Sequence, residues 1–192
     1  MKGCRRIAPI LALAITSSLW AQQIAAPAHS QDAQKLAAEM QIIQRELNSV
    51  GKLNFAVAVS NADEKGTSQM SEQVSNVTAD SATCSIRYHW WESIAGNMVD
   101  DEDKSIKLHD VLGVSTISAE ESWKKEAQKE GATPDELRVY YEKFDPPMFI
   151  VAMRMAGDDG EAFSFVDEKQ ADRVGQAVAQ AVLLCGGKNQ RF

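Results

Sequence analysis

Apolar residues recur at helical spacing near both ends of the chain. Over residues 31–50 they follow at intervals of three and four, which places them on one narrow stripe of a helix that ends at Gly51. A second helix is predicted over about 168–185, where Asp167 caps the start and Gly186 follows the end. The first stripe consists of Leu36, Met40, Ile43, Leu47 and Val50, and the second of Ala171, Val174, Val178, Ala181, Val182 and Cys185. Because the first stripe is narrow, we expect the N-terminal helix at the edge of the domain.

Between these helices the apolar residues mostly alternate with polar ones, which is the period of a half-buried strand. The clearest strand covers 82–92, with Cys84, Ile86, Tyr88 and Trp90 on one face and Arg87, His89 and Trp91 on the other. Further strands are predicted over 53–59, 74–78, 106–114, 148–155 and 162–166, and over 137–144, which also suits a helix. The polar stretch 61–71 is expected to be a loop and the acidic run 100–103 a turn.

Residues 118–131 differ from the rest of the chain because they are highly charged. Ser118 and Glu121 form a capping-box pattern, Glu121 and Lys125 are spaced for an ion pair, and Trp123 is the one large apolar residue that can face inward. We therefore expect a surface helix here. The whole pattern predicts an α+β domain with a mainly antiparallel, bent sheet.

The first 28 residues have the features of a secretory signal peptide. A basic start is followed by a short apolar core and then by small residues, with cleavage expected after Ala21 or after Ala28. The apolar core is shorter than the roughly 20 residues that cross a membrane, although a retained N-terminal anchor helix is the alternative. We expect an exported protein, periplasmic or secreted, whose residues 29–192 form a single globular domain without a membrane span.

The charge balance limits the partners of this domain. The chain has 20 basic and 27 acidic side chains, and loss of residues 1–28 removes three basic residues and no acid, so the net charge moves from −7 to about −10. An acidic domain repels nucleic acids and anionic lipid surfaces. We therefore expect no nucleic-acid partner.

Two cysteines, Cys84 and Cys185, follow the expected signal peptide. In an oxidising compartment such a pair forms a disulfide, while two free thiols or a redox pair are the alternatives. The strand period and the helix period each turn one of these cysteines inward. The pattern thus predicts a disulfide that docks the C-terminal helix on the sheet near Cys84.

The C-terminal part of the chain resembles a known group of proteins. Phe163-Ser164-Phe165, an acidic cap and an alanine-rich helix that ends in Leu-Cys-Gly-Gly (184–187) are similar to exported bacterial proteins of unassigned function. The resemblance covers about the last hundred residues and implies a pleckstrin-homology-like domain, in which a bent antiparallel sheet is closed by a C-terminal helix. The N-terminal helix and the segment 118–133 depart from that pattern, and the motif defines no functional residues.

Candidate chemistry is sparse. Arg87, His89 and Trp91 share one strand face and are the candidate ligand-binding residues, because aromatic side chains with polar neighbours often line binding surfaces. The alternative is an ordinary solvated strand face. The acidic run lacks the glycine and glutamate spacing of a calcium loop, and no paired cysteine or histidine ligands indicate zinc. We expect no metal and no cofactor.

Three functional hypotheses remain. The first is a non-enzymatic binding or interaction protein whose partner is a small molecule or an envelope protein. The second is a small secreted hydrolase that uses His89 or His109, although no nucleophile-elbow motif is present. The third is a structural cell-envelope component whose N-terminal helix pairs with a partner through an exposed apolar stripe.

Overall fold

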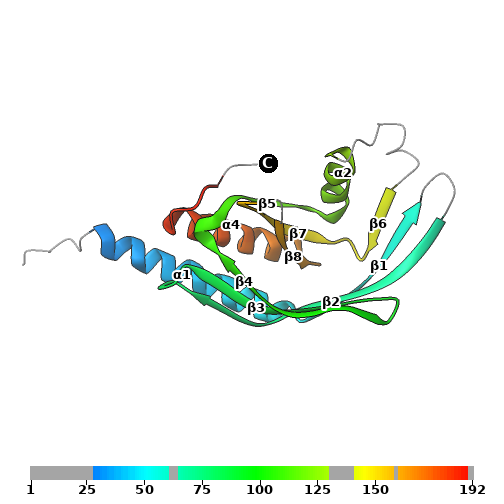
Figure 1. Cartoon of the computed structure of the whole chain (residues 1–192), viewed down its shortest axis with the longest axis horizontal. Helices are drawn as coiled ribbons and strands as arrows, with labels where there is room; N and C mark the ends of the chain where they lie inside the picture. The colour runs from blue at the N-terminus through cyan, green and yellow to red at the C-terminus, as the bar shows by residue number, and fades with distance from the viewer. Residues whose placement is uncertain (1–27, 61–64, 130–140, 158–159, 190–192) are drawn as a thin grey trace, which may run out of the picture.

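The computed structural model describes residues 28–60, 65–129, 141–157 and 160–189 (Figure 1). The expected signal peptide lies outside this range except for Ala28, at which the first helix begins. The helices are α1 (Ala28–Val50), α2 (Ala119–Lys129) and α4 (Glu168–Leu184), with a 3₁₀ turn at Leu108–Asp110. The strands are β1 (Lys52–Ser60), β2 (Lys65–Asp80), β3 (Ser85–Ile94), β4 (Asn97–Lys107), β5 (Val111–Ser118), β6 (Tyr141–Asp145), β7 (Phe149–Met155) and β8 (Gly160–Phe165).

These strands form two open antiparallel sheets, which confirms the predicted α+β class. The large sheet has the order β4-β3-β2-β1-β6 and the small sheet the order β5-β7-β8. Figure 1 shows the large sheet as a curved layer and the small sheet above it, with α1 and α4 at one end and α2 at the other. The described strands therefore form two layers rather than one bent sheet.

The main core lies between the two sheets at the end that holds α1 and α4. Phe163 and Phe165 on β8 are fully buried there, and the Tyr88 ring of β3 meets the Phe163 ring edge-on with the centroids 5.1 Å apart. The Tyr88 hydroxyl also donates a hydrogen bond to Glu161 of β8 (2.7 Å). Aromatic packing and one hydrogen bond thus join the large sheet to the small one.

Helix α1 contributes its apolar stripe to this core, while its other faces are mostly exposed. Leu36, Met40, Ile43 and Leu47 are between 0 and 8 % exposed. The helix packs on β2 and alongside α4. Sequence periodicity shows which face of a helix is apolar, but it does not show how many elements share that face.

Two side-chain amides of α1 bind the backbone of β2 where the strand is bulged. The register between β2 and β3 shifts between Ser75 and Thr78, and Asn76 lies in the left-handed region with φ 54°. The Asn48 amide donates to Val77 O (2.9 Å) and accepts from Val77 N (3.0 Å), and Gln44 Oε1 accepts from Ala79 N (3.0 Å). The helix therefore satisfies backbone groups that the bulge removes from the ladder.

The disulfide between Cys84 and Cys185 is present, with the Cα atoms 5.9 Å apart and a sequence separation of 101. Cys84 lies in the turn that precedes β3, not within the strand as expected, and Cys185 caps α4. Both pack against the main core. The bond therefore fixes the C-terminal end of α4 to the start of β3.

Three other expectations are wrong. Residues 65–71, expected to be loop, belong to the long strand β2, while residues 61–64 lie outside the described range. The acidic run 100–103, expected to be a turn, lies within β4. Both segments extend past the main core, where a strand pairs through its backbone and its side chains stay polar. The strand expected over 106–114 is also wrong, because the 3₁₀ turn Leu108–Asp110 divides it between β4 and β5. The remaining predicted strands and all three helices are confirmed within the described residues, with shifted boundaries.

Replacing either Cys84 or Cys185 by serine is expected to lower the melting temperature by roughly 10–15 °C. Closing a loop of about a hundred residues is worth about 4–5 kcal/mol in the chain-entropy model, and each kcal/mol moves the melting temperature of a domain this size by roughly 2–4 °C. Calorimetry of each variant and of the double variant measures the effect. If the double variant melts well below both single variants, the cysteines do not act as one pair.

Asn48→Ala is expected to destabilise the protein by about 1–3 kcal/mol, because it leaves the part-buried N–H and C=O of Val77 without their partner. Urea unfolding measures the loss. Gln41→Ala, at an exposed position of the same helix, is the matched control. If both variants lose the same small amount of unfolding free energy, the two hydrogen bonds between the Asn48 amide and Val77 contribute nothing beyond helix propensity.

Candidate functional site

The three residues predicted as a ligand-binding face, Arg87, His89 and Trp91, lie on the outer face of the large sheet. His89 Nε2 is 2.9 Å from Asp101 Oδ1 and its Nδ1 is 3.0 Å from Asp103 Oδ1, both on β4. The hydrogen bond with Asp103 raises the pKa of His89, as does the charge of Asp101. The ammonium group of Lys52 lies 4.2 Å from the centroid of the Trp91 ring.

The structure thus places His89 and Trp91 in contacts with neighbouring strands of their own sheet. Neither residue, nor Arg87, lines the groove or the hollow described below. His109, the other histidine considered for catalysis, is exposed and lies 3.3 Å from the neighbouring Asp110. His89 and His109 thus have carboxylate neighbours, and neither of them lines the groove or the hollow.

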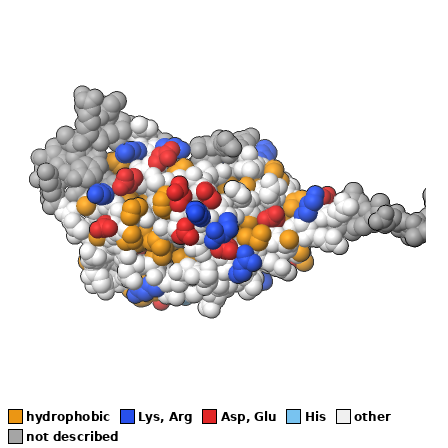
Figure 2. Space-filling view, turned by 180° about the vertical axis from the view of Figure 1, so that it is seen from behind, with side chains coloured by type: hydrophobic (Ala, Val, Ile, Leu, Met, Phe, Trp, Pro, Cys, Tyr) orange, Lys and Arg blue, Asp and Glu red, His pale blue; other side chains and the backbone are white. Residues whose placement is uncertain are grey.

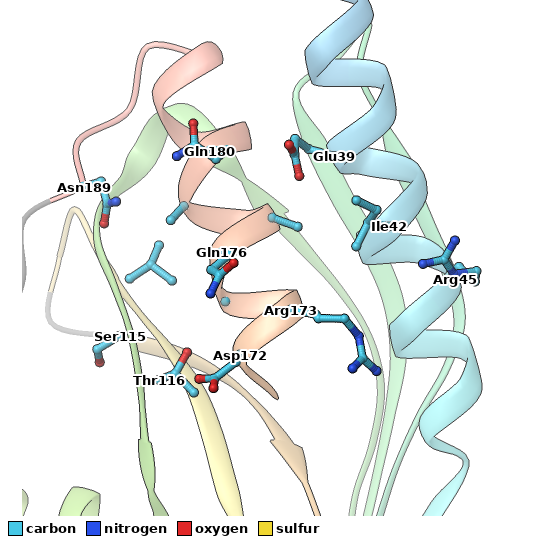
Figure 3. Close-up of a pocket in the computed structure, with 14 residues that line it drawn as sticks. Glu39, Ile42, Arg45, Ser115, Thr116, Asp172, Arg173, Gln176, Gln180 and Asn189 are labelled. Atoms are coloured by element: carbon cyan, nitrogen blue, oxygen red, sulfur yellow. The ribbon is translucent and has the colours of Figure 1, made fainter. Parts of the chain in front are cut away.

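A wide polar groove of 930 Å³ crosses the exposed side of α4 (Figure 3). Residues of α1 form one wall and residues of β5 the other, and Figure 3 shows Arg173 extending from α4 toward α1. Arg173 reaches the Glu46 carboxylate (3.2 Å), which Arg45 also contacts (2.9 Å), and the hydrogen bond from Arg45 lowers the pKa of Glu46. These charges pair with one another, so they hold the two helices together.

A smaller hollow of 270 Å³ opens at the other end of the molecule, between the large sheet, α2 and the small sheet. Its position follows from the fold: the Ala119 N–H at the start of α2 donates to Met148 O (2.9 Å), and Ser118 Oγ caps the helix by accepting from Glu121 N (3.1 Å). This anchor places α2 over the inner face of β1 and β6. The lining residues are Phe55, Met70, Glu72, Ala119, Ser122, Trp123, Phe144, Met148, Ile150 and Ser164.

Most of this lining is aromatic or aliphatic. The rings of Phe55 and Phe144 lie on neighbouring strands with their centroids 6.0 Å apart. Leu53, Phe55, Val57, Ala119 and Met148 form a second, smaller core beneath the hollow. Glu72 is the only charged side chain among the lining residues.

Glu72 is a carboxylic acid in a core position. The side chain points to the inner face of β2 between Met70 and Val74, it is 8 % exposed, and its Oε1 atom is buried without a hydrogen-bond partner. Burial raises the pKa of Glu72 to about 7, a hydrogen bond with Ser164 of β8 opposes that rise, and the charge of Glu92 adds to it. The carboxyl group therefore changes its ionisation near neutral pH.

Glu72 begins a row of three acids that crosses the large sheet. The register pairs Glu72 with Glu92 of β3, and Glu92 with Asp100 of β4. Burial raises the pKa of Glu92, and the charge of Asp100 raises it further. Lys104 lies beside the end of the row, 2.9 Å from Glu102 and 4.0 Å from Asp100. Like charges on directly opposed strand positions repel. This row of acids therefore lowers the free energy of unfolding.

The acids do not form a metal site. Among the described residues, no group of three or more histidine, cysteine or acidic side chains is arranged to hold a metal ion. Figure 2, which views the molecule from behind, shows acidic and basic side chains interspersed on that face. Around Glu72, by contrast, the strand register places three acids side by side on the inner face.

Comparisons with protein-family models, with curated proteins and with solved structures find no significant match. The function of this chain therefore has to be argued from its own residues. Within the described ranges, every helix is too short or too polar to span a membrane.

Sequence reasoning missed Glu72 because it fell in the boundary between an expected loop and a short expected strand. The signal was present: Met70, Glu72 and Val74 alternate with polar residues, which places an acid on the apolar face once the strand is extended. The hollow itself needs Trp123, Phe144 and Ile150, which come from three elements whose positions relative to one another the sequence does not show.

Glu72→Gln is expected to stabilise the protein by about 3 kcal/mol at pH 8 and to have little effect at pH 4. The folded protein holds the Glu72 proton up to about pH 7, whereas the unfolded chain releases it near 4.5. The free energy of unfolding therefore falls as pH rises between these values. Urea unfolding from pH 4 to pH 8 measures the difference between the variant and the wild type.

Glu39→Gln removes an acid of α1 that lies far from the hollow, and this variant should show no such pH-dependent gain over the wild type. A Glu72→Gln variant whose advantage does not change between pH 4 and pH 8 would mean that the carboxyl group is solvated in the folded protein.

Proposed function

We propose that this protein is an exported, non-enzymatic binding protein that takes a small, mainly apolar ligand in the hollow beneath α2. The observation that carries the proposal is the lining of the hollow: aromatic and aliphatic side chains from both sheets and from α2 surround one buried carboxyl group. A concave apolar site with one polar group that orients the ligand is the usual form of a small-molecule site.

The dimensions of the hollow limit the ligand. Its volume of 270 Å³ is slightly below the usual range of small-molecule sites, roughly 300–1,000 Å³. A ligand that consists of a single ring and a short alkyl chain has a suitable size for this hollow.

Export is supported by two features of the chain. The disulfide between Cys84 and Cys185 is of a kind that persists in oxidising compartments. Residues 1–28 have the sequence pattern of a signal peptide. The partner hypothesis for the N-terminal helix has less support, because the apolar stripe of α1 is buried within the protein.

Titration of the purified protein with 4-phenylbutan-1-ol in a calorimeter tests the proposal. We expect a dissociation constant below about 1 mM, which corresponds to about −4 kcal/mol, a reasonable binding free energy for a ligand of this size. The fluorescence of Trp123, which lines the hollow, should change along the same curve.

Two variants of α2 make the test specific. Ser122→Phe fills the hollow and should abolish binding, whereas Lys124→Phe places the same side chain at an exposed position of the same helix and should leave binding intact. Circular dichroism verifies that both variants fold. Equal binding by the two variants would show that the alcohol binds elsewhere, and the proposal would then be abandoned.

A further inference from the structure

We propose that the ligand is an organic cation, with an ammonium group against the Glu72 carboxylate and an apolar body against the aromatic side chains of the hollow. This inference rests on the proposed function and adds the chemical class of the ligand. It starts from a charge imbalance on the inner face of the large sheet, where the buried carboxyl group of Glu72 has no basic side chain beside it in the described part of the chain.

The imbalance is visible in the contacts of the acids on the inner face. Within the described part of the chain, no basic side chain lies within ion-pair distance of Glu72 or Glu92. Lys104, the nearest cation along the row, pairs with Glu102 and Asp100 and lies 5.8 Å from the Trp90 ring centroid. The charge of Lys104 still lowers the pKa of Glu92. Glu72 is therefore the carboxyl group that faces the interior without a counter-ion among the described residues.

Burial makes this arrangement costly in the empty protein. Glu72 is 8 % exposed, and Oε1 accepts no hydrogen bond from the protein. An ionised carboxylate in an apolar setting is stabilised by a positive charge or by several hydrogen bonds, and the hollow supplies only the Ser164 hydroxyl. A ligand that brings a positive charge removes the cost, whereas a neutral ligand leaves it and an anion increases it.

The aromatic lining favours the same class of ligand. Phe55, Phe144 and Trp123 lie around the hollow that contains the carboxyl group. Ring faces attract cations, and the attraction grows to about 2 kcal/mol or more where water is excluded. A carboxylate combined with aromatic rings is thus suited to an ammonium group on an apolar body. A bare metal ion is disfavoured because the described acids do not converge on a coordination site.

The test compares three ligands that share one apolar body: 4-phenylbutylammonium, 4-phenylbutan-1-ol and 4-phenylbutyrate. Calorimetric titrations are made at pH 8, where Glu72 is mainly ionised and the amine is protonated. We expect the ammonium compound to bind at least tenfold more tightly than the alcohol, and the carboxylate to bind most weakly.

Glu72→Gln should reduce the affinity for the ammonium compound at least tenfold and change the affinity for the alcohol by less than threefold. Glu39→Gln, which removes one acid of α1 outside the hollow, should keep the preference for the ammonium compound. Glu92→Gln should reduce that preference about threefold, because it removes the opposed carboxyl group but not the one in the hollow. If Glu72→Gln does not fold, the comparison of Glu92→Gln with the wild type tests the inference instead.

The outcomes separate the two proposals. Equal binding of the ammonium compound and the alcohol overturns the cation inference and leaves the binding function in place. A preference for the ammonium compound that persists in Glu72→Gln also overturns the inference, because the charge that is recognised then lies elsewhere. If neither the ammonium compound nor the alcohol binds, the proposed function itself fails.

Discussion

The architecture depends on the packing of two open sheets against each other, with the larger core at one end. At that end Phe163 and Phe165 fill the space between the layers, α1 and α4 cover it, and the bond from Cys84 to Cys185 holds α4 to the start of β3. At the other end the layers are bridged by α2, which is anchored through Ala119. The joined end provides the stability, and the bridged end leaves the hollow that surrounds Glu72.

The carboxyl group of Glu72 is the clearest departure of this chain from the rules that stabilise a fold. An acid at a core position, opposite a second acid on the neighbouring strand, lowers stability when it is ionised. Glutamine would have much the same shape without the charge. Local violations of this kind tend to occur at functional sites, where the stability that is lost is regained when a ligand binds.

Much of the fold was predictable from the sequence because it depends on local periodicity. The alternation around Ile86 and Tyr88 reflects one strand and the stripe of α4 reflects one helix, and together they predicted the α+β class. The disulfide was predicted as well, although Cys84 lies in the turn just before the strand. The length of β2 and the strand that contains Asp100 could not be predicted, because polar strands are held by backbone pairing with their neighbours. The hollow was missed for the same reason: its walls come from elements distant in sequence.

The acidic run of β4 has a consequence for how the protein behaves toward copies of itself. Within the described residues β4 pairs only with β3, so one edge of the large sheet is open, and the side chains of Asp101, Glu102 and Asp103 there are between 44 and 91 % exposed. Open edges are the usual starting points of strand-by-strand aggregation, and exposed charged side chains on an edge strand disfavour the approach of a second edge. A segment that looks like a turn in the sequence thus gives the large sheet an edge that is poorly suited to pairing with a neighbouring molecule.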